Sequence, residues 1–172
     1  MNFAELEEFE DSLKKRAEGS GGSASMYSRY HAFVIPHSAQ RYNTVGDYYS
    51  PYPSSLELRI SDLENTDYEF LVLIHELVEA YLCAKRGISE PEITAFDMAF
   101  RGAGGPGNRL DAPYHKEHVF AENIERQIAA EMGVDWETYS VAVDAICEAG
   151  QGPDPEQETE PMSASDTNTG SE

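Results

Sequence analysis

Thr66-Asp-Tyr-Glu-Phe-Leu-Val-Leu-Ile-His-Glu-Leu-Val-Glu-Ala-Tyr-Leu-Cys-Ala-Lys-Arg-Gly87 is the stretch that decides the fold of this 172-residue chain. Apolar residues occur nearly all the way round a helix built from it, which is typical of a helix buried inside a domain. The spacing Thr66-x-x-Glu69 is that of a capping box, and Gly87 supplies a stop signal. The sequence therefore predicts one central helix at about residues 67 to 86, and we expect any chemistry to be centred on it.

One histidine and two carboxylates lie in the middle of this helix: His75, Glu76 and Glu79. Buried charges are normally paired, since an unpaired one costs roughly several kcal/mol. His75 and Glu79 lie one turn apart on the same face, so both can reach one metal ion. Glu76 has the position of the general base in the His-Glu-x-x-His helix of zinc peptidases, with Glu79 in place of the second histidine. The competing explanation is a structural hydrogen bond between His75 and Glu79.

A histidine from another segment would complete a zinc site of two histidines and one carboxylate. His118 is the first choice and His115 the second, since both fall on a later predicted helix. Glu122 and Glu125 continue the same stripe, which could add ligands or orient the imidazoles, or could be an exposed polar face. Asp97 is either a further ligand or a helix-surface carboxylate.

The segments around the central helix predict an α+β fold. An apolar run at 32–35 that Pro36 ends, a second segment at 42–49 interrupted by Gly46, and strict alternation at 56–60 predict a small antiparallel sheet. Helices follow at about 89–100, at about 115–132 and from 135 onward, which makes about four helices with the central one. The expected domain organisation is an N-terminal amphipathic helix at 1–18, a flexible linker at 19–26, a single α+β metal-binding domain at 27–149 and a disordered acidic tail at 150–172.

The charge of the chain excludes some partners. Thirty-two acidic residues against 12 basic ones give a net charge of −20, which repels nucleic-acid phosphate and anionic lipid.

No apolar run is long enough to span a bilayer, and the acidic start is unlike a secretory signal. Cys83 and Cys147 stand far apart, so neither a disulfide framework nor a thiolate zinc site is indicated. These features predict a cytoplasmic protein without direct nucleic-acid or membrane binding.

Five short segments together resemble an uncharacterised family of small phage and prophage proteins. They are Thr44-Val-Gly-Asp47, His75-Glu-Leu-Val-Glu-Ala80, Phe96-Asp97, Ala112-Pro-Tyr-His-Lys-Glu-His118 and Gly133-Val-Asp-Trp136. The resemblance covers about residues 30 to 139 and implies a compact α+β fold and a phage-associated setting in the host cytoplasm, but no reaction. A looser similarity, to zincin-type metallopeptidases, rests on His75 and Glu76 and implies a zincin-like central helix.

Three functions are compatible with these residues. The first is a metal-dependent hydrolase of peptides or esters, with His75, Glu79 and His118 as ligands of zinc or another divalent metal and Glu76 as the general base. The second is a phosphohydrolase of the HD type. His75 and Glu76, together with Glu79 and the later Asp97, are loosely similar to the His-Asp helix of that class. The third is a non-catalytic phage protein that binds a host protein through its acidic surface.

Overall fold

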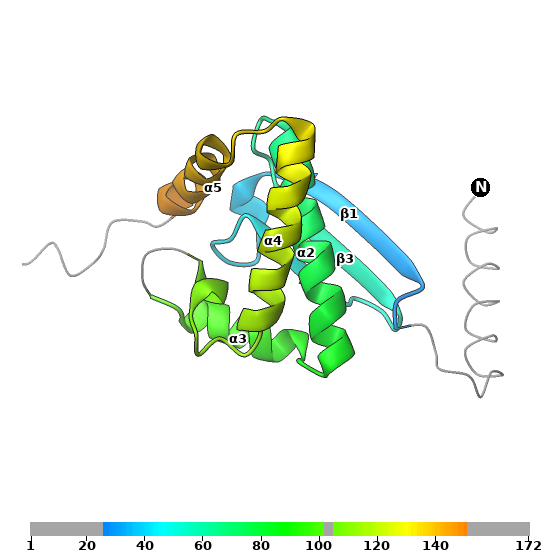
Figure 1. Ribbon diagram of the computed structural model, residues 1–172. Coiled ribbons are helices and arrows are strands. Elements are labelled where there is room, and N and C mark those ends of the chain that lie inside the picture. The colour runs from blue at the N-terminus through cyan, green and yellow to red at the C-terminus, as the bar shows by residue number, and fades with distance from the viewer. Residues whose placement is uncertain (1–25, 102–104, 151–172) are drawn as a thin grey trace, which may run out of the picture.

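The computed structural model of this protein describes residues 26–101 and 105–150 (Figure 1). Within them it has a three-stranded sheet and four α-helices, which confirms the α+β class and the predicted number of helices. The predicted N-terminal helix at 1–18, nearly all of the linker at 19–26 and nearly all of the acidic tail at 150–172 lie outside the described residues.

The sheet is mixed, not wholly antiparallel as predicted. Its strands are β1 (Arg29–Ile35), β2 (Gly46–Tyr49) and β3 (Ser55–Ser61), in the order β1-β3-β2. β2 pairs antiparallel with β3, whereas β1 pairs parallel with β3. After β1 the chain passes through a short 3-10 helix, η1 (His37–Ala39), and forms β2 on the far side of β3. Alternation of apolar and polar residues along a strand predicts which face of the strand is buried. It does not predict whether the neighbouring strand runs parallel or antiparallel to it.

The helices are α2 (Thr66–Arg86), α3 (Glu90–Ala99), α4 (His115–Met132) and α5 (Trp136–Gly150), and the 3-10 turn η2 (Pro106–Asn108) precedes α4. α2 lies between the sheet and α4, as Figure 1 shows. The bounds of α2 differ from the predicted 67–86 by one residue. The N-cap is Asn65, however, and not Thr66 as the capping-box spacing predicts: the side-chain oxygen of Asn65 accepts a hydrogen bond from the backbone N–H of Asp67 at 3.0 Å. Gly87 ends α2 in the left-handed conformation, with φ at 78°.

The core holds α2 against β3. The alternate residues Leu56, Leu58 and Ile60 of β3 are almost completely buried and belong to the two apolar clusters that also include residues of α2. Ala129 of α4 and Tyr139 of α5 join the cluster around Ile60. This packing fixes the buried face of α2, which carries the candidate site, against β2, α4 and α5. Among the residues placed by the structure, no helix combines the length and the apolar character needed to cross a membrane.

Candidate metal centre

Three polar side chains meet between α2 and α4. His118 Nδ1 lies 2.9 Å from Glu79 Oε2 and 3.1 Å from His75 Nε2, and His75 Nε2 lies 3.4 Å from Glu79 Oε2. His75 and Glu79 are buried, and His118 is mostly covered. The structure therefore brings together the three residues that the sequence selected as a ligand set, although His118 lies 39 residues after Glu79 in the chain.

The triangle formed by these three atoms has the dimensions of a metal-binding site. Nitrogen and oxygen ligands about 2.0–2.2 Å from a zinc ion in tetrahedral geometry are about 3.3–3.6 Å apart. The observed separations of 2.9, 3.1 and 3.4 Å are close to this spacing, so a small shift of the side chains would accommodate an ion. The donor set of two imidazoles and one carboxylate is one that catalytic zinc sites use.

A second layer of hydrogen bonds orients the three side chains. Glu125 of α4 places its Oε2 2.8 Å from His75 Nδ1, on the side of the ring opposite the triangle. The hydroxyl of Tyr139, on α5, donates to the other oxygen of Glu125. The hydroxyl of Tyr48, on β2, donates to Glu79 Oε1 at 3.3 Å. In metal sites, a carboxylate that accepts the N–H of one ring nitrogen of a histidine leaves the other ring nitrogen unprotonated and directed at the ion.

The electrostatics of the cluster are set by buried carboxylates. Burial lowers the pKa of His75, but hydrogen bonds to Glu125 and Glu79 outweigh burial and hold that pKa well above its usual value. Burial raises the pKa of Glu79, but hydrogen bonds from His118 and His75 overcome this and lower it to about 2. Within the described residues, no ion pair joins Glu76, Glu79 or Glu125 to a lysine or an arginine. A cation would therefore be stabilised here.

Glu76 lies beside the triangle, against the backbone of β2. A Cβ added at Gly46 would stand 2.3 Å from Glu76 Oε1 and 2.6 Å from Glu76 Cγ, so only glycine permits this approach. Burial, followed by the charge of Glu79, raises the pKa of Glu76 well above its usual value. No hydrogen bond fixes the Glu76 carboxylate among the residues that the structure describes. Glu76 is thus a buried carboxyl group whose pKa responds to the charges of the candidate ligands Glu79 and His75.

The loop before α4 positions His118 through its backbone. Gly107, in η2, lies so close to the imidazole of His118 that an added Cβ would stand 2.4 Å from its Cγ. His115, the second choice for a ligand, instead places its Nδ1 2.9 Å from the carbonyl oxygen of Gly107. His115 therefore lies outside the triangle and fastens the loop that packs on His118.

Two other candidates are also placed outside the triangle. Glu122 forms an ion pair with Arg126 on the partly exposed side of α4, so it neither faces the triangle nor orients an imidazole. Asp97, on α3, accepts hydrogen bonds from the hydroxyls of Tyr114 and, at 3.3 Å, Tyr42. Burial raises the pKa of Asp97 to about 6. Of the four additional candidates, only Glu125 contacts a member of the triangle.

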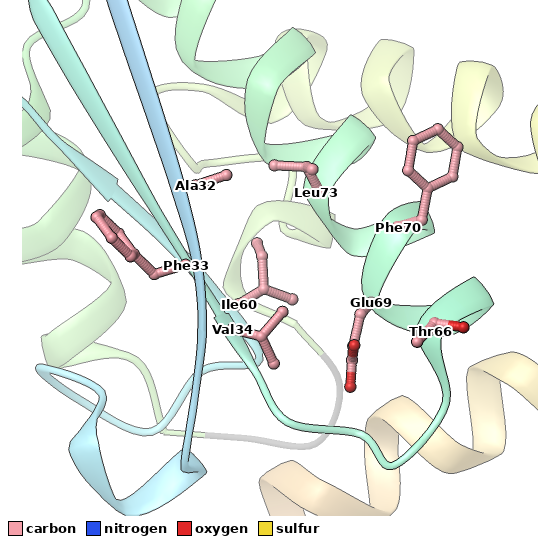
Figure 2. A pocket seen from close by; sticks show the side chains of 8 residues that line it. All are labelled: Ala32, Phe33, Val34, Ile60, Thr66, Glu69, Phe70 and Leu73. Atoms are coloured by element: carbon pink, nitrogen blue, oxygen red, sulfur yellow. The ribbon is translucent and has the colours of Figure 1, made fainter. Parts of the chain in front are cut away.

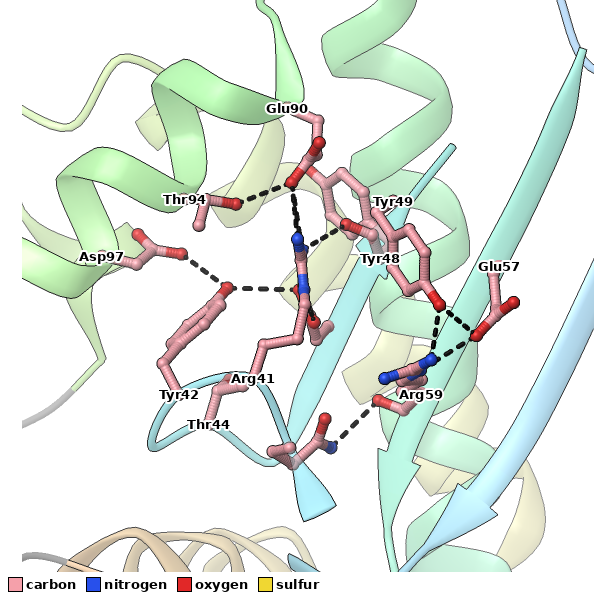
Figure 3. A network of polar contacts seen from close by, with 12 residues as sticks. Arg41, Tyr42, Thr44, Tyr48, Tyr49, Glu57, Arg59, Glu90, Thr94 and Asp97 are labelled. Carbon is pink, nitrogen blue, oxygen red and sulfur yellow. Dashed lines mark hydrogen bonds and ion pairs between the residues drawn. The ribbon is translucent and has the colours of Figure 1, made fainter. Parts of the chain in front are cut away.

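Polar contacts tie β2 to α3 and so hold Gly46 in place beside Glu76. The guanidinium of Arg41 lies between two carboxylates, with Nε 2.6 Å from Asp47 and Nη1 3.0 Å from Glu90. Figure 3 shows its contact with Glu90. Tyr42 completes the connection, since its hydroxyl contacts Asp47 and also Asp97, the second of which is labelled in Figure 3. Asp47, which follows Gly46 in β2, is thus joined to α3 through Arg41 and Tyr42.

Sequence reasoning missed four contributors to the site: Tyr48, Tyr139 and the two close-packed glycines, Gly46 and Gly107. Tyr48 and Tyr139 fit the strand and helix patterns as ordinary core residues, so nothing in the sequence distinguishes their hydroxyls. The glycines stand in segments that the sequence marked as loop or strand interruption, but which side chain they approach depends on the tertiary fold. His31 is exposed on β1, and His37 contacts Ser61 and Asn43, as expected for surface or structural histidines.

Comparison with known proteins adds no relative: no family model, no curated protein and no solved structure matches this chain.

Proposed function

We propose that this protein is a metal-dependent hydrolase, with zinc as the first choice of metal and a peptide or an ester as substrate. The observation that carries the proposal is the triangle of His75 Nε2, Glu79 Oε2 and His118 Nδ1, with edges of 2.9 to 3.4 Å. Glu125, behind His75, supports it because metal-binding histidines generally donate their second N–H to such a group. The resemblance to phage and prophage proteins supports a phage-associated setting.

The roles follow from position. When bound, the ion supplies Lewis acidity, which polarises a carbonyl oxygen and makes a neighbouring water molecule more acidic. His75, Glu79 and His118 would hold the ion, and Glu125 would keep Nε2 of His75 directed at it. Glu76 accepts the proton of the attacking water and passes it to the leaving group. Burial and the charge of Glu79 raise the pKa of Glu76, and a raised pKa makes its carboxylate a stronger base than a free one.

The fold favours this function over the HD-type phosphohydrolase, because that class is all-helical and the present chain builds one wall of its site from β2. Asp97, which that alternative needs as a ligand, is held by Tyr42 and Tyr114 on α3. The non-catalytic binding protein rests on the net charge of −20 and makes no use of the triangle.

The first test is the metal content of the purified, tag-free chain, measured by mass spectrometry after zinc has been supplied. We expect about one zinc per chain, lost in His118→Ala and in a His75→Ala plus Glu79→Ala double variant that circular dichroism shows to be folded. His31→Ala is the matched control, because His31 is exposed on β1 and should leave the zinc content unchanged. Absence of zinc from the native chain would remove the basis for the proposal.

The second test separates metal binding from catalysis. Glu76→Gln keeps the shape of the side chain and removes its ability to accept a proton. We expect this variant to retain zinc and to lose hydrolysis of peptide and ester libraries. If the native chain, fully loaded with zinc, hydrolyses neither library, the hydrolase assignment is wrong even though the metal site exists.

A further inference from the structure

The central helix has a second apolar face, opposite the site. His75, Glu76 and Glu79 point toward β2, α4 and the core, while Phe70, Leu77 and Tyr81 recur at helical spacing on the other side of α2. On this outer face Phe70 is 43% exposed and Tyr81 is 41% exposed. A helix that is apolar on all sides normally has all its sides covered. Within the described residues, the outer face of α2 lacks such a cover.

The neighbouring strand is uncovered in the same way. β1 is an edge strand whose five central residues are all exposed, with Tyr30 at 49% and Val34 at 53%. α2 packs on β2 and β3, the other two strands of the sheet. Strands are about 4.8 Å apart and a helix is about 10 Å wide, so one helix covers two strands and leaves room for a second helix over the third.

Two hollows lie along the line where β1 meets the outer face of α2. One, of about 390 Å³, is lined by Tyr30, Leu77 and Tyr81, with Phe120 of α4 at its side. The other, of about 260 Å³, lies near the start of α2 and is shown in Figure 2, where Val34 and Leu73 face it from β1 and α2. Both hollows are lined by apolar residues of β1 and α2, and we call this surface the β1–α2 groove.

The chain itself carries a segment that fits the β1–α2 groove. Residues 3–17, which lie outside the described residues, place Phe3, Leu6, Phe9 and Leu13 at helical intervals and put acidic residues between them. At 1.5 Å per residue, this apolar stripe is about 15 Å long as a helix, and the stripe from Phe70 to Tyr81 is about 16 Å long. The lengths of the two apolar surfaces match.

The linker between residues 3–17 and the groove is long enough to let the segment reach it and short enough to keep the two close. The described chain begins at Met26, four residues before Tyr30, which lines the larger hollow. Residues 18–26, rich in glycine and serine, span up to about 30 Å when extended, which is longer than the groove itself. A segment tethered this closely meets its own groove at an effective concentration on the order of millimolar, above that of any second copy in dilute solution.

We propose that residues 3–17 dock as a helix in the β1–α2 groove of their own chain, with Phe3, Leu6, Phe9 and Leu13 against α2 and β1. The docked segment completes the helical layer on this face of the sheet and covers the outer side of the helix whose inner side carries His75 and Glu79. This inference is independent of metal binding, since it concerns the opposite face of α2.

The test measures whether the segment shields position 81. In the full-length chain, Tyr81→Cys is introduced together with Cys147→Ser, and the rate of thiol modification by a maleimide is measured. Cys83 can stay, because it is buried and burial raises the pKa of its thiol to about 12. We expect the double variant Leu6→Asp plus Phe9→Asp to accelerate modification at position 81 by about tenfold or more. The two substitutions remove apolar contacts with the groove, and an effective concentration on the order of millimolar does not compensate for that loss.

The matched control is Glu8→Ala plus Asp11→Ala, which changes the polar face of the same predicted helix and should leave the slow rate unchanged. Light scattering on each chain gives its mass in solution. Equal modification rates with and without the Leu6 and Phe9 substitutions would overturn the proposal. So would protection that appears only in a dimer and fades on dilution, because a second copy would then occupy the groove.

Discussion

Glu125→Gln is the substitution that best separates a metal centre from an ordinary polar cluster. Glu125 does not belong to the triangle of candidate ligands, but its Oε2 lies 2.8 Å from Nδ1 of His75 and its side chain is 5% exposed. Glutamine keeps the size of the side chain and an oxygen that can accept from His75, and it removes only the negative charge. The variant should therefore stay folded and still bind zinc, more weakly.

The expected loss follows from that one contact. A hydrogen bond to a charged group contributes about 1.5–3 kcal/mol, and each 1.4 kcal/mol corresponds to about a factor of ten in affinity. Zinc affinity should therefore fall by about 10- to 100-fold, which is also the usual cost of removing a partner behind a metal-bound histidine. Competition against a fluorescent zinc chelator at pH 7.5 measures the change.

Glu122→Gln is the control, because Glu122 lies on the same helix and pairs with Arg126 away from the triangle. Its zinc affinity should equal that of the native chain. If Glu125→Gln and Glu122→Gln bind zinc equally well, Glu125 does not orient a ligand and the reasoning about the second layer fails. If Glu125→Gln binds no zinc at all, Glu125 is itself a ligand, and the assigned triangle is wrong.

Three further substitutions test the surroundings of the site. Gly107→Ala should displace the His118 ring, because its Cβ would stand 2.4 Å from His118 Cγ, and chelator competition should show zinc affinity at least about tenfold lower. Gly46→Ala should displace the Glu76 carboxylate and lower kcat by about 100-fold or more while zinc content by mass spectrometry stays at the native level. Asp97→Asn should stabilise the chain at pH 8 but not at pH 4 in urea unfolding. The folded pKa of about 6 lies above the ordinary value of 3.8, so ionisation of the carboxyl costs stability that accumulates between these two values and reaches up to about 3 kcal/mol above them.

The sequence was sufficient for the parts of the site that depend on one helix. The i, i+4 spacing of His75 and Glu79 predicts a shared face, and the apolar residues around them predict burial, and both hold in the structure. The choice of His118 over His115 was correct for proximity to that pair, because only His118 turns toward α2. The sequence could not show that Tyr139 would reach Glu125, since that contact depends on how α5 packs.

The same distinction applies to the fold. Periodicity predicted the existence of each described helix, because a buried stripe repeats along the chain and is visible in the sequence. It did not predict that β1 would lie parallel to β3, since strand direction is decided by the path of the intervening chain. It also made α2 look buried on all sides, whereas the described residues cover only the face that bears His75 and Glu79.

Two explanations of the buried cluster can be separated by the sign of its pH dependence. Without a metal, hydrogen bonds to Glu125 and Glu79 raise the pKa of the His75 imidazole in the folded chain, although burial opposes them. The stabilisation from protonated His75 is then fully present below its unfolded pKa of about 6.5 and is lost as pH rises through the raised folded value. A metal requires the opposite, because it binds neutral imidazoles and competes with protons, so its stabilisation grows as pH rises. If the cluster is a metal centre, chelator-treated protein should lose stability as pH rises above about 6.5, while zinc-loaded protein should exceed it by a margin that widens as pH rises. If zinc leaves the unfolding midpoint unchanged at every pH, His75 and Glu79 form a structural hydrogen-bonded pair.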